Sequence, residues 1–326
     1  MAITDQQSQI LSLVELDAET PITKLQKQTS FRSHTIHYAL HRLQQLDIIK
    51  KVPFIDMKKL GYLDFALYFS LATGQPNKRK EILDYLIASP IVTWVGELGG
   101  DFQYGLAMYV KTLPEFLNFL NELSEKFGDV FFQKSFSLHT SFVRFNRKYL
   151  HPQTVPMNIS VETPDKIVIL DDLDKKILWA TATYPDHSRR ELANTLKIPF
   201  STLNKRVNAL EKKEILKGYV YFVDPTKLRM QTFNFLIYAK GLPKKLKKQL
   251  LNFSEKHQNI IHLVECIGEW DFEIGVEVEK NADTTKILQE LYESFGEDIR
   301  TIKTVPVFKN VKYLFYRDYP EGTETI

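Results

Sequence analysis

The strongest constraint on how this chain can fold is an internal repeat that spans almost half of it. A shift of 167 residues aligns Ile10-Leu11 with Ile177-Leu178, Leu25 with Leu192, Thr35 with Thr202 and Leu43 with Leu210. Farther along, a shift of 168 aligns Leu120-Asn121-Glu122-Leu123 with Leu288-Gln289-Glu290-Leu291. Solenoid repeats have periods of about 20–50 residues, so this period indicates a duplicated unit of more than one domain. The proline-containing segment 151–168 predicts an extended linker between the copies.

Composition limits the class of protein. With 326 residues, 44% of them hydrophobic, the chain can form several domains with separate cores. Its one cysteine, Cys266, excludes an internal disulfide framework and a cysteine-based zinc cluster. The chain has neither a signal-peptide pattern at its start nor an apolar run of about 18 residues, so we expect a cytoplasmic protein with no membrane partner.

The second copy shows the local pattern most clearly. Helices are expected from Asp172 to Ala182, from a Ser188 N-cap to Leu196, and from Ser201 to Lys213. The following segment, 215–223, is β-branched and aromatic with a central glycine, which predicts a hairpin. Three helices and a hairpin form a winged helix-turn-helix. We expect one at residues 1–60 and another at 169–229.

The rest of each copy predicts an α/β domain. In copy two the expected order is strand 233–239, helix 243–257, strands 260–267 and 272–278, helix 283–295 and strand 299–308. Copy one repeats this order with strands 65–72, 91–98, 102–110 and 130–138 and helices 78–88 and 114–127. The order βαββαβ is that of the ferredoxin-like sandwich, expected at residues 61–150 and 230–320. The fold class is therefore α+β.

The third helix of each copy carries a functional signal. At 100° per residue, Leu203, Val207 and Leu210 form an apolar stripe, and in copy one Ile36, Leu40 and Leu43 do so. Residues 197–217 hold six basic against two acidic side chains, a local charge of +4 that exceeds the +3 of the whole chain. Polar and basic residues on such a face can contact base edges and phosphates of double-stranded DNA. The expected DNA contacts are Arg32, Ser33, His34, His37, Tyr38, His41, Arg42, Lys50 and Lys51 in copy one, and Ser201, Thr202, Asn204, Lys205, Arg206, Asn208, Lys212 and Lys217 in copy two.

Two other interpretations of these faces remain. A polar outer helix face can simply be solvated. His34, His37 and His41 share one helical face and could bind a metal, but no thiol or carboxylate joins them. We therefore expect neither a metal nor a cofactor.

At this point the chain resembles the Lrp/AsnC family of transcription regulators in both copies. The residues that carry the resemblance are Asp174-Lys175-Lys176-Ile177-Leu178, Ser188-Arg189-Arg190-Glu191-Leu192-Ala193, Ser201-Thr202-Leu203-Asn204-Lys205-Arg206-Val207-Asn208-Ala209-Leu210-Glu211 and Asp224-Pro225. The resemblance implies sequence-specific DNA binding, and an arrangement of the two copies as an intramolecular pseudo-dimer that could associate further. In copy one Lys51 stands at the place of Gly218, a departure in the wing.

The resemblance also implies a place for a small effector such as an amino acid. Gly268-Glu269-Trp270-Asp271 resembles the family's glycine-to-aspartate hairpin, and the corresponding copy-one residues are Leu98-Gly99-Gly100-Asp101. The expected effector-binding residues are Gly99, Gly100, Asp101, Gly268, Trp270 and Asp271. The alternative is structural, because glycine permits a tight turn and aspartate can cap it without a ligand.

Two rival functions share this architecture. Siroheme decarboxylases resemble fused units of the same type, but strands 101–106 and 271–276 lack the histidine expected for that chemistry. No other catalytic motif is present, so the sequence predicts that the chain is not an enzyme. The other rival is a sensor or scaffold that does not bind DNA.

Overall fold

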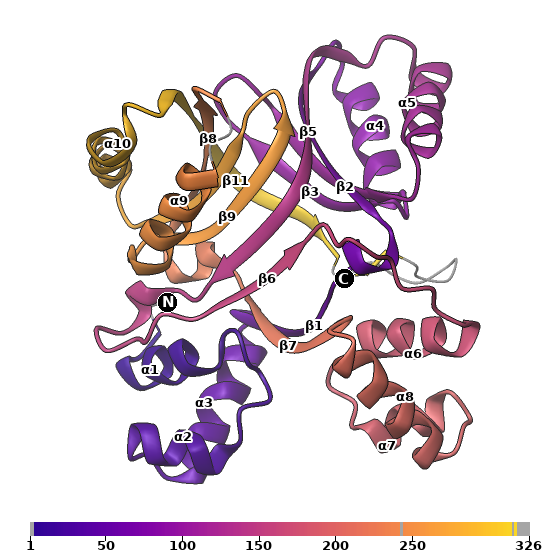
Figure 1. The fold of residues 1–326 in the computed structure, drawn as a ribbon, viewed down its shortest axis with the longest axis vertical. Helices are drawn as coiled ribbons and strands as arrows, with labels where there is room; N and C mark the ends of the chain where they lie inside the picture. Colours follow the sequence, from indigo (N-terminus) through magenta and orange to yellow (C-terminus); the bar gives the residue numbers. More distant parts are fainter. Residues whose placement is uncertain (1–2, 242–243, 315, 318–326) are drawn as a thin grey trace.

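The computed structural model describes residues 3–241, 244–314 and 316–317 (Figure 1). Two units of three helices and one strand lie side by side below a large β-structure. The first comprises α1 (Asp5–Val14), α2 (Ile22–Thr29), α3 (Ser33–Gln45) and β1 (Ile49–Ile55). The second comprises α6 (Asp172–Thr183), α7 (Arg189–Thr195), α8 (Phe200–Lys212) and β7 (Leu216–Val223). Ser188 caps α7 through a capping box with Glu191, as its sequence predicts.

The predicted hairpin wing at 215–223 is wrong. β7 runs through Gly218 without turning and pairs antiparallel with β1 from the other unit. Within this pairing Val52 lies opposite Val220, which is its own counterpart at the 168-residue offset. An antiparallel pair centred on counterparts has local two-fold symmetry, so β1 and β7 form a symmetric ribbon between the two units.

Each half then continues with the predicted βαββαβ order. The first half has β2 (Leu63–Leu71), α4 (Pro76–Ala88), β3 (Val92–Leu98), β4 (Tyr104–Val110), α5 (Leu113–Phe127) and β5 (Phe131–Phe145). The second has β8 (Gln231–Ala239), α9 (Lys244–Lys256), β9 (Ile260–Gly268), β10 (Phe272–Val278), α10 (Ala282–Phe295) and β11 (Ile299–Tyr313). Residue 243, where the sequence predicts the start of α9, lies outside the described residues. Short 3-10 turns cover Lys58–Leu60, Lys148–Leu150 and Pro225–Leu228.

β5 and β11 extend beyond their predicted ends at residues 138 and 308 because each crosses into the other half. β5 pairs with β2 and with β9, while β11 pairs with β8 and with β3. The segment 151–168, predicted as a linker, contains β6 (Asn158–Glu162), which adds to β5. The strand order is β2-β4-β3-β11-β8-β10-β9-β5-β6, and the further β2–β5 pairing closes the sheet on itself.

Closure divides the sheet into two faces with different packing. Outward side chains such as Leu67 and Phe235 are fully buried in two cores, one beneath α4 and α5 and one beneath α9 and α10. Figure 1 shows these helix pairs on opposite sides of the β-structure. Side chains that point inward from both halves meet in a separate cluster that includes Tyr68 and Trp270. The inside of the closed sheet is therefore shared by the two halves.

Among the described residues, none of the helices is long and apolar enough to cross a membrane.

Candidate functional site

The second three-helix unit exposes the polar face of α8. Leu203, Val207 and Leu210 are buried in its core, as the helical periodicity predicts. Ser201, Lys205, Asn208 and Lys212 are exposed, and Thr202 and Asn204 are half-buried. The residues expected to contact DNA therefore form one accessible face.

Contacts within the unit hold part of this face in place. Arg189 Nη1 donates to the Oδ1 atoms of Asn204 at 2.7 Å and Asn208 at 2.6 Å. Because Arg189 occupies these oxygens, the two amide groups present their NH₂ donors outward. Arg206 is paired with Asp171 and Asp174 instead, at 2.5 and 3.2 Å. Of the predicted contacts in α8, Arg206 is therefore the one engaged by carboxylates of its own unit.

The first unit offers a different face on α3. His34, His37, Tyr38 and His41 are exposed, with Tyr38 69% exposed. Arg32 is also exposed, and Ser33 and Arg42 are half-buried. The buried stripe consists of Ile36, Ala39 and Leu43, so Ala39 takes the place predicted for Leu40, which is only half-buried.

The three lysines predicted at the wings lie in the β1–β7 ribbon. Lys217 donates to the backbone carbonyl of Ser160 at 2.6 Å and lies 3.6 Å from Asp56. Lys51 pairs with Glu19 at 3.3 Å and covers the ring of Tyr219. Burial lowers the pKa of Lys50. Since the predicted hairpin is absent, these lysines are not carried on a protruding wing.

The residues predicted to bind an effector lie where the two halves of the chain contact each other. The Gly99 amide donates to Pro306 and the Glu269 amide donates to Phe136. Trp270 is 0% exposed, and Asp271 Oδ2 accepts from the Ala239 amide at 2.6 Å. Burial of Trp270 and the Asp271–Ala239 hydrogen bond agree with the structural alternative for these two residues. An effector role stays a prediction for all six residues, Gly99, Gly100, Asp101, Gly268, Trp270 and Asp271.

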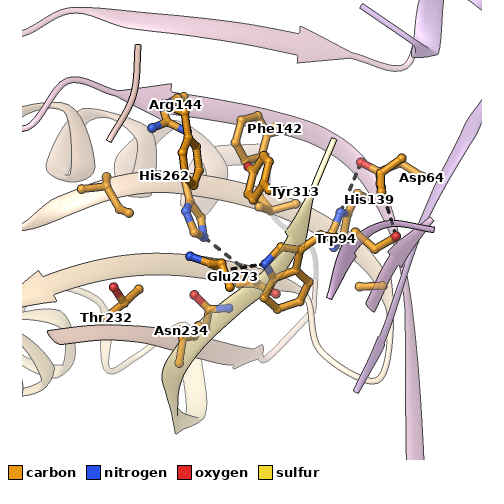
Figure 2. Close-up of a pocket in the computed structure, with 18 of the residues that line it drawn as sticks. Asp64, Trp94, His139, Phe142, Arg144, Thr232, Asn234, His262, Glu273 and Tyr313 are labelled. Carbon is orange, nitrogen blue, oxygen red and sulfur yellow. Dashed lines mark hydrogen bonds and ion pairs between the residues drawn. The ribbon is translucent and has the colours of Figure 1, made fainter. Parts of the chain in front are cut away.

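A cavity lies between the β1–β7 ribbon and the inner face of the closed sheet (Figure 2). The cavity is open to solvent. Counterparts from the two halves line it, including Phe54 with Phe222 and Thr93 with Ile261. Other counterparts differ in chemistry, such as Trp94 with His262 and Tyr109 with Glu277. The cavity therefore lies at the approximate two-fold axis but has an asymmetric lining.

One side of the cavity carries a buried histidine-carboxylate pair. His139 Nδ1 lies 3.3 Å from Asp64 Oδ2, and Lys58 Nζ lies 3.7 Å from the same oxygen. Burial favours the neutral form of Asp64, but the charges of His139 and Lys58 outweigh burial and hold the pKa of Asp64 below its usual range. An ionised Asp64 fixes the imidazole through Nδ1. The other ring nitrogen, His139 Nε2, is buried and has no hydrogen-bond partner within residues 3–241, 244–314 and 316–317.

The opposite side contains a second histidine in a polar network. His262 Nε2 lies 3.6 Å from Glu273 Oε1, while Glu273 Oε2 accepts from Tyr68 Oη at 3.2 Å. Asn234 Nδ2 in turn donates to Tyr68 Oη at 2.7 Å. Burial raises the pKa of Tyr68 well above its usual value, so Tyr68 is a neutral donor to Glu273. Figure 2 shows the two histidine pairs on different sides of the cavity.

A buried ionic network lies where the cavity meets the first three-helix unit. Arg147 binds Glu277 through two bonds of 2.8 and 2.7 Å and also binds Glu15, which is fully buried at the end of α1. Tyr149 donates to Glu277 at 2.5 Å. Arg147 thereby connects the first unit, the end of β5 and strand β10.

The sequence prediction missed this cavity. The sequence feature that could have indicated the cavity is a charged residue within an apolar strand. Asp64, Glu273 and Glu277 each occur in this way. A charged residue in a buried strand requires a buried partner. The partners His139, His262 and Arg147 are far away in sequence, so the pairing is visible only in the folded chain.

Comparisons with known proteins give one match to the second three-helix unit and another to nearly the whole chain. A family model described as winged helix-turn-helix DNA-binding matches residues 170–217. The HTH-type transcriptional regulator FL11 of Pyrococcus horikoshii is 29% identical over 113 residues, which cover 34% of this chain and 74% of that protein. FL11 of Pyrococcus furiosus is 28% identical over 120 residues, covering 36% and 78%.

Similarity over the full length is to an enzyme. The crystal structure of the siroheme decarboxylase NirDL has a TM-score of 0.65 at 14% identity and covers 97% of this chain and 95% of its own. Its complex with an iron-uroporphyrin III analogue has a TM-score of 0.62 at 14% identity, covering 96% and 93%. This match contradicts the prediction that the chain is not an enzyme. The prediction depended on the lack of histidine in strands 101–106 and 271–276; the histidines that line the cavity, His139 and His262, lie instead in β5 and β9. Residues 170–217 thus match a helix-turn-helix DNA-binding family model, without the hairpin wing in this structure, and the chain shares the fold of NirDL over nearly its whole length.

Proposed function

We propose that this chain is a sequence-specific DNA-binding transcription regulator of Lrp type. The observation that carries the proposal is the match of residues 170–217 to a DNA-binding winged helix-turn-helix whose third helix, α8, exposes Lys205, Asn208 and Lys212. The exposed lysines can neutralise phosphates, and the asparagine amides can donate to acceptors on base edges. The FL11 relatives, named as transcriptional regulators, support the same function.

The arrangement of the two units extends the proposal to the whole chain. We propose that residues 1–150 and 169–320 are duplicated copies that form an intramolecular pseudo-dimer, because counterparts pair across the β1–β7 ribbon. Each chain then presents α3 and α8 to one DNA duplex, as the two subunits of a helix-turn-helix dimer do. The DNA contacts predicted on α3, from Arg32 to Arg42, belong to this proposal.

A mobility-shift titration against genomic fragments tests DNA binding. The double variant Asn204→Ala/Lys205→Ala should lower specific affinity by about tenfold or more, since a good contact to a base contributes about 1–3 kcal/mol. Lys248→Ala/Asn252→Ala is the matched control, because it removes the same residue types from the exposed face of α9. Equal affinity of both variants and the parent protein would move the interface away from α8.

The cavity supports a second candidate function, an enzyme that acts on a carboxylate of a tetrapyrrole. The specific observation is His139, which lines the cavity: Asp64 contacts its Nδ1, and its buried Nε2 has no hydrogen-bond partner among the described residues. A positioned imidazole can transfer a proton during decarboxylation. Titration with siroheme, followed by absorbance and product mass, should show loss of carbon dioxide that His139→Gln slows at least 100-fold. An unchanged product mass would exclude this candidate.

A further inference from the structure

We propose that the central cavity binds one flat aromatic carboxylate per chain. The ligand carboxylate binds Arg144, and a polar group at the other end of the ligand forms a hydrogen bond with His139. The proposal requires binding only, so it is independent of DNA binding, and it can be tested without any chemical conversion.

Arg144 is the cation in this cavity whose charge is least compensated. It is 8% exposed, and its Nε is buried without a hydrogen-bond partner in the part of the chain that the structure describes. Among the described residues the carboxylate paired with Arg144 is that of Glu15 at 3.8 Å, and the guanidinium also hydrogen-bonds the Tyr313 side chain. Glu15 and Glu277 are both bound by Arg147. A buried guanidinium with an unused donor favours a carboxylate ligand.

His139 provides the second unfilled position. The residue is 9% exposed, and none of the described residues forms a hydrogen bond with its buried Nε2. Asp64 holds the opposite nitrogen, so the ring cannot turn to satisfy Nε2 without losing that contact. A buried polar atom left unsatisfied costs free energy that a ligand hydrogen bond would recover.

The structure of β5 brings both groups into one cavity. The register shifts between His139 and Ser141, so the strand has a bulge at Thr140. The bulge changes the alternation of side chains, and His139, Phe142 and Arg144 all line the cavity. Four or five strand steps separate the two polar groups, roughly 13–16 Å between Cα atoms.

The walls between these two ends favour a flat ligand. Trp94, Phe142 and Tyr313 line the space between Arg144 and His139 (Figure 2). Aromatic rings stack against planar ligands, and a two-ring system with polar groups at both ends spans the remaining distance. These features define the ligand class.

Because the two halves of the cavity differ, we expect one ligand per chain, bound in one orientation. The counterpart of Arg144 is Lys312, whose Nζ instead donates to the carbonyls of Ile87 and Ser89, at 2.7 Å each. The counterpart of His139 is Val307, which has no polar side chain. The second half therefore lacks both ligand-binding groups at these positions.

Isothermal calorimetry with 6-hydroxy-2-naphthoate on the full chain tests the proposal. We expect one site per chain. Two analogues isolate the two ends: 6-hydroxy-2-naphthamide lacks the charge, and 2-naphthoate lacks the hydroxyl group. Each analogue should bind at least about tenfold more weakly, since hydrogen bonds to charged groups contribute more than neutral ones.

Variants assign each end of the ligand to its residue. In Arg144→Gln the acid and the amide should bind equally, and in His139→Gln the hydroxy acid and 2-naphthoate should bind equally. Lys312→Gln is the matched control: it removes a buried cation from the equivalent strand position outside the cavity and should retain the parent affinity. Arg144→Lys retains the charge but not Nε, and should bind the acid with intermediate affinity.

Three results would overturn the proposal. The first is that the acid does not bind the parent protein up to about 1 mM. The second is that the parent protein binds the acid and its amide equally, and the third is that Arg144→Gln still binds the acid more tightly than the amide. The analogue comparisons need no substitution, so they remain decisive if a variant fails to fold.

Discussion

Asp64 shows how a single buried charge can determine both stability and site geometry. It faces Lys58 and His139 in the closed sheet and is itself buried. Replacing it by asparagine leaves Lys58 buried without an opposite charge. Breaking a buried ion pair from one side typically costs about 3–5 kcal/mol. We expect Asp64→Asn to lower the free energy of unfolding at pH 7 by about 3 kcal/mol, measured by urea denaturation.

The pH dependence of this effect has a defined sign. The folded state lowers the pKa of Asp64, so its contribution is present above the unfolded value of about 3.8 and is lost as the pH falls through the lower folded pKa. The difference in stability between Asp64→Asn and the parent should therefore shrink in acid. Asp84→Asn, an exposed aspartate on α4, is the control and should change little. A difference that stays constant with pH would contradict the assignment.

Two buried lysines, Lys148 and Lys312, should make the free energy of unfolding depend on pH in the alkaline range. Burial lowers the pKa of both Lys148 and Lys312 to about 8. Between pH 8 and about 10.4 the unfolded chain binds more protons at these residues than the folded chain, so their contribution makes stability rise with pH. Lys312→Met should reduce this rise, as measured by urea denaturation at pH 7.5 and 9.5. A rise of the same size in the variant would show that Lys312 titrates normally.

At the scale of elements, glycines in the inner strands make room for large rings. A Cβ atom on Gly275 of β10 would lie 2.1 Å from the His262 ring, and one on Gly105 of β4 would lie 2.6 Å from Trp94. Each glycine lies beneath the ring from the neighbouring strand. We expect Gly275→Ala to destabilise the protein by about 1–3 kcal/mol, as overpacking commonly does, and to displace His262.

Gly74→Ala provides the control, because a Cβ atom there meets nothing within 4 Å. Thermal unfolding compares the two variants, and the NMR signals of His262 report displacement of its ring. Equal melting temperatures together with unshifted His262 signals would show that the close contact does not constrain this ring.

Elements that depend on local pattern could be predicted from the sequence, whereas those that depend on distant partners could not. The Ser188 cap, the stripe of Leu203, Val207 and Leu210, and the βαββαβ order all follow from residues close together in the chain. The hairpin prediction failed because the partner of β7 lies about 170 residues away, in β1. The cavity was missed for the same reason, since His139 and Asp64 meet only when β5 pairs with β2.

For the whole molecule, the Arg147 network links the two sites. Glu15 belongs to the first three-helix unit, Glu277 to the sheet of the second half, and Arg147 also lines the cavity. The Arg147 guanidinium further donates to the Val223 carbonyl of β7 at 3.4 Å. A ligand on the neighbouring Arg144 would therefore lie next to the contacts that position both three-helix units. This proximity provides a physical route by which the cavity could influence DNA binding.

The last prediction concerns the shape of the DNA site and follows from the proposed pseudo-dimer. Two identical reading helices require a palindromic site, because the two-fold symmetry of the protein is mirrored in the half-sites. Here α3 exposes His34, His37 and His41, whereas α8 presents Lys205 and Asn208. The groups offered to base edges therefore differ, and one chain should bind two unlike half-sites whose centres lie about one helical turn, or a small multiple of it, apart. Selection from random duplexes, followed by footprinting at one chain per site, measures this. Recovery of a true palindrome bound by two chains would instead show that only α8 reads the sequence.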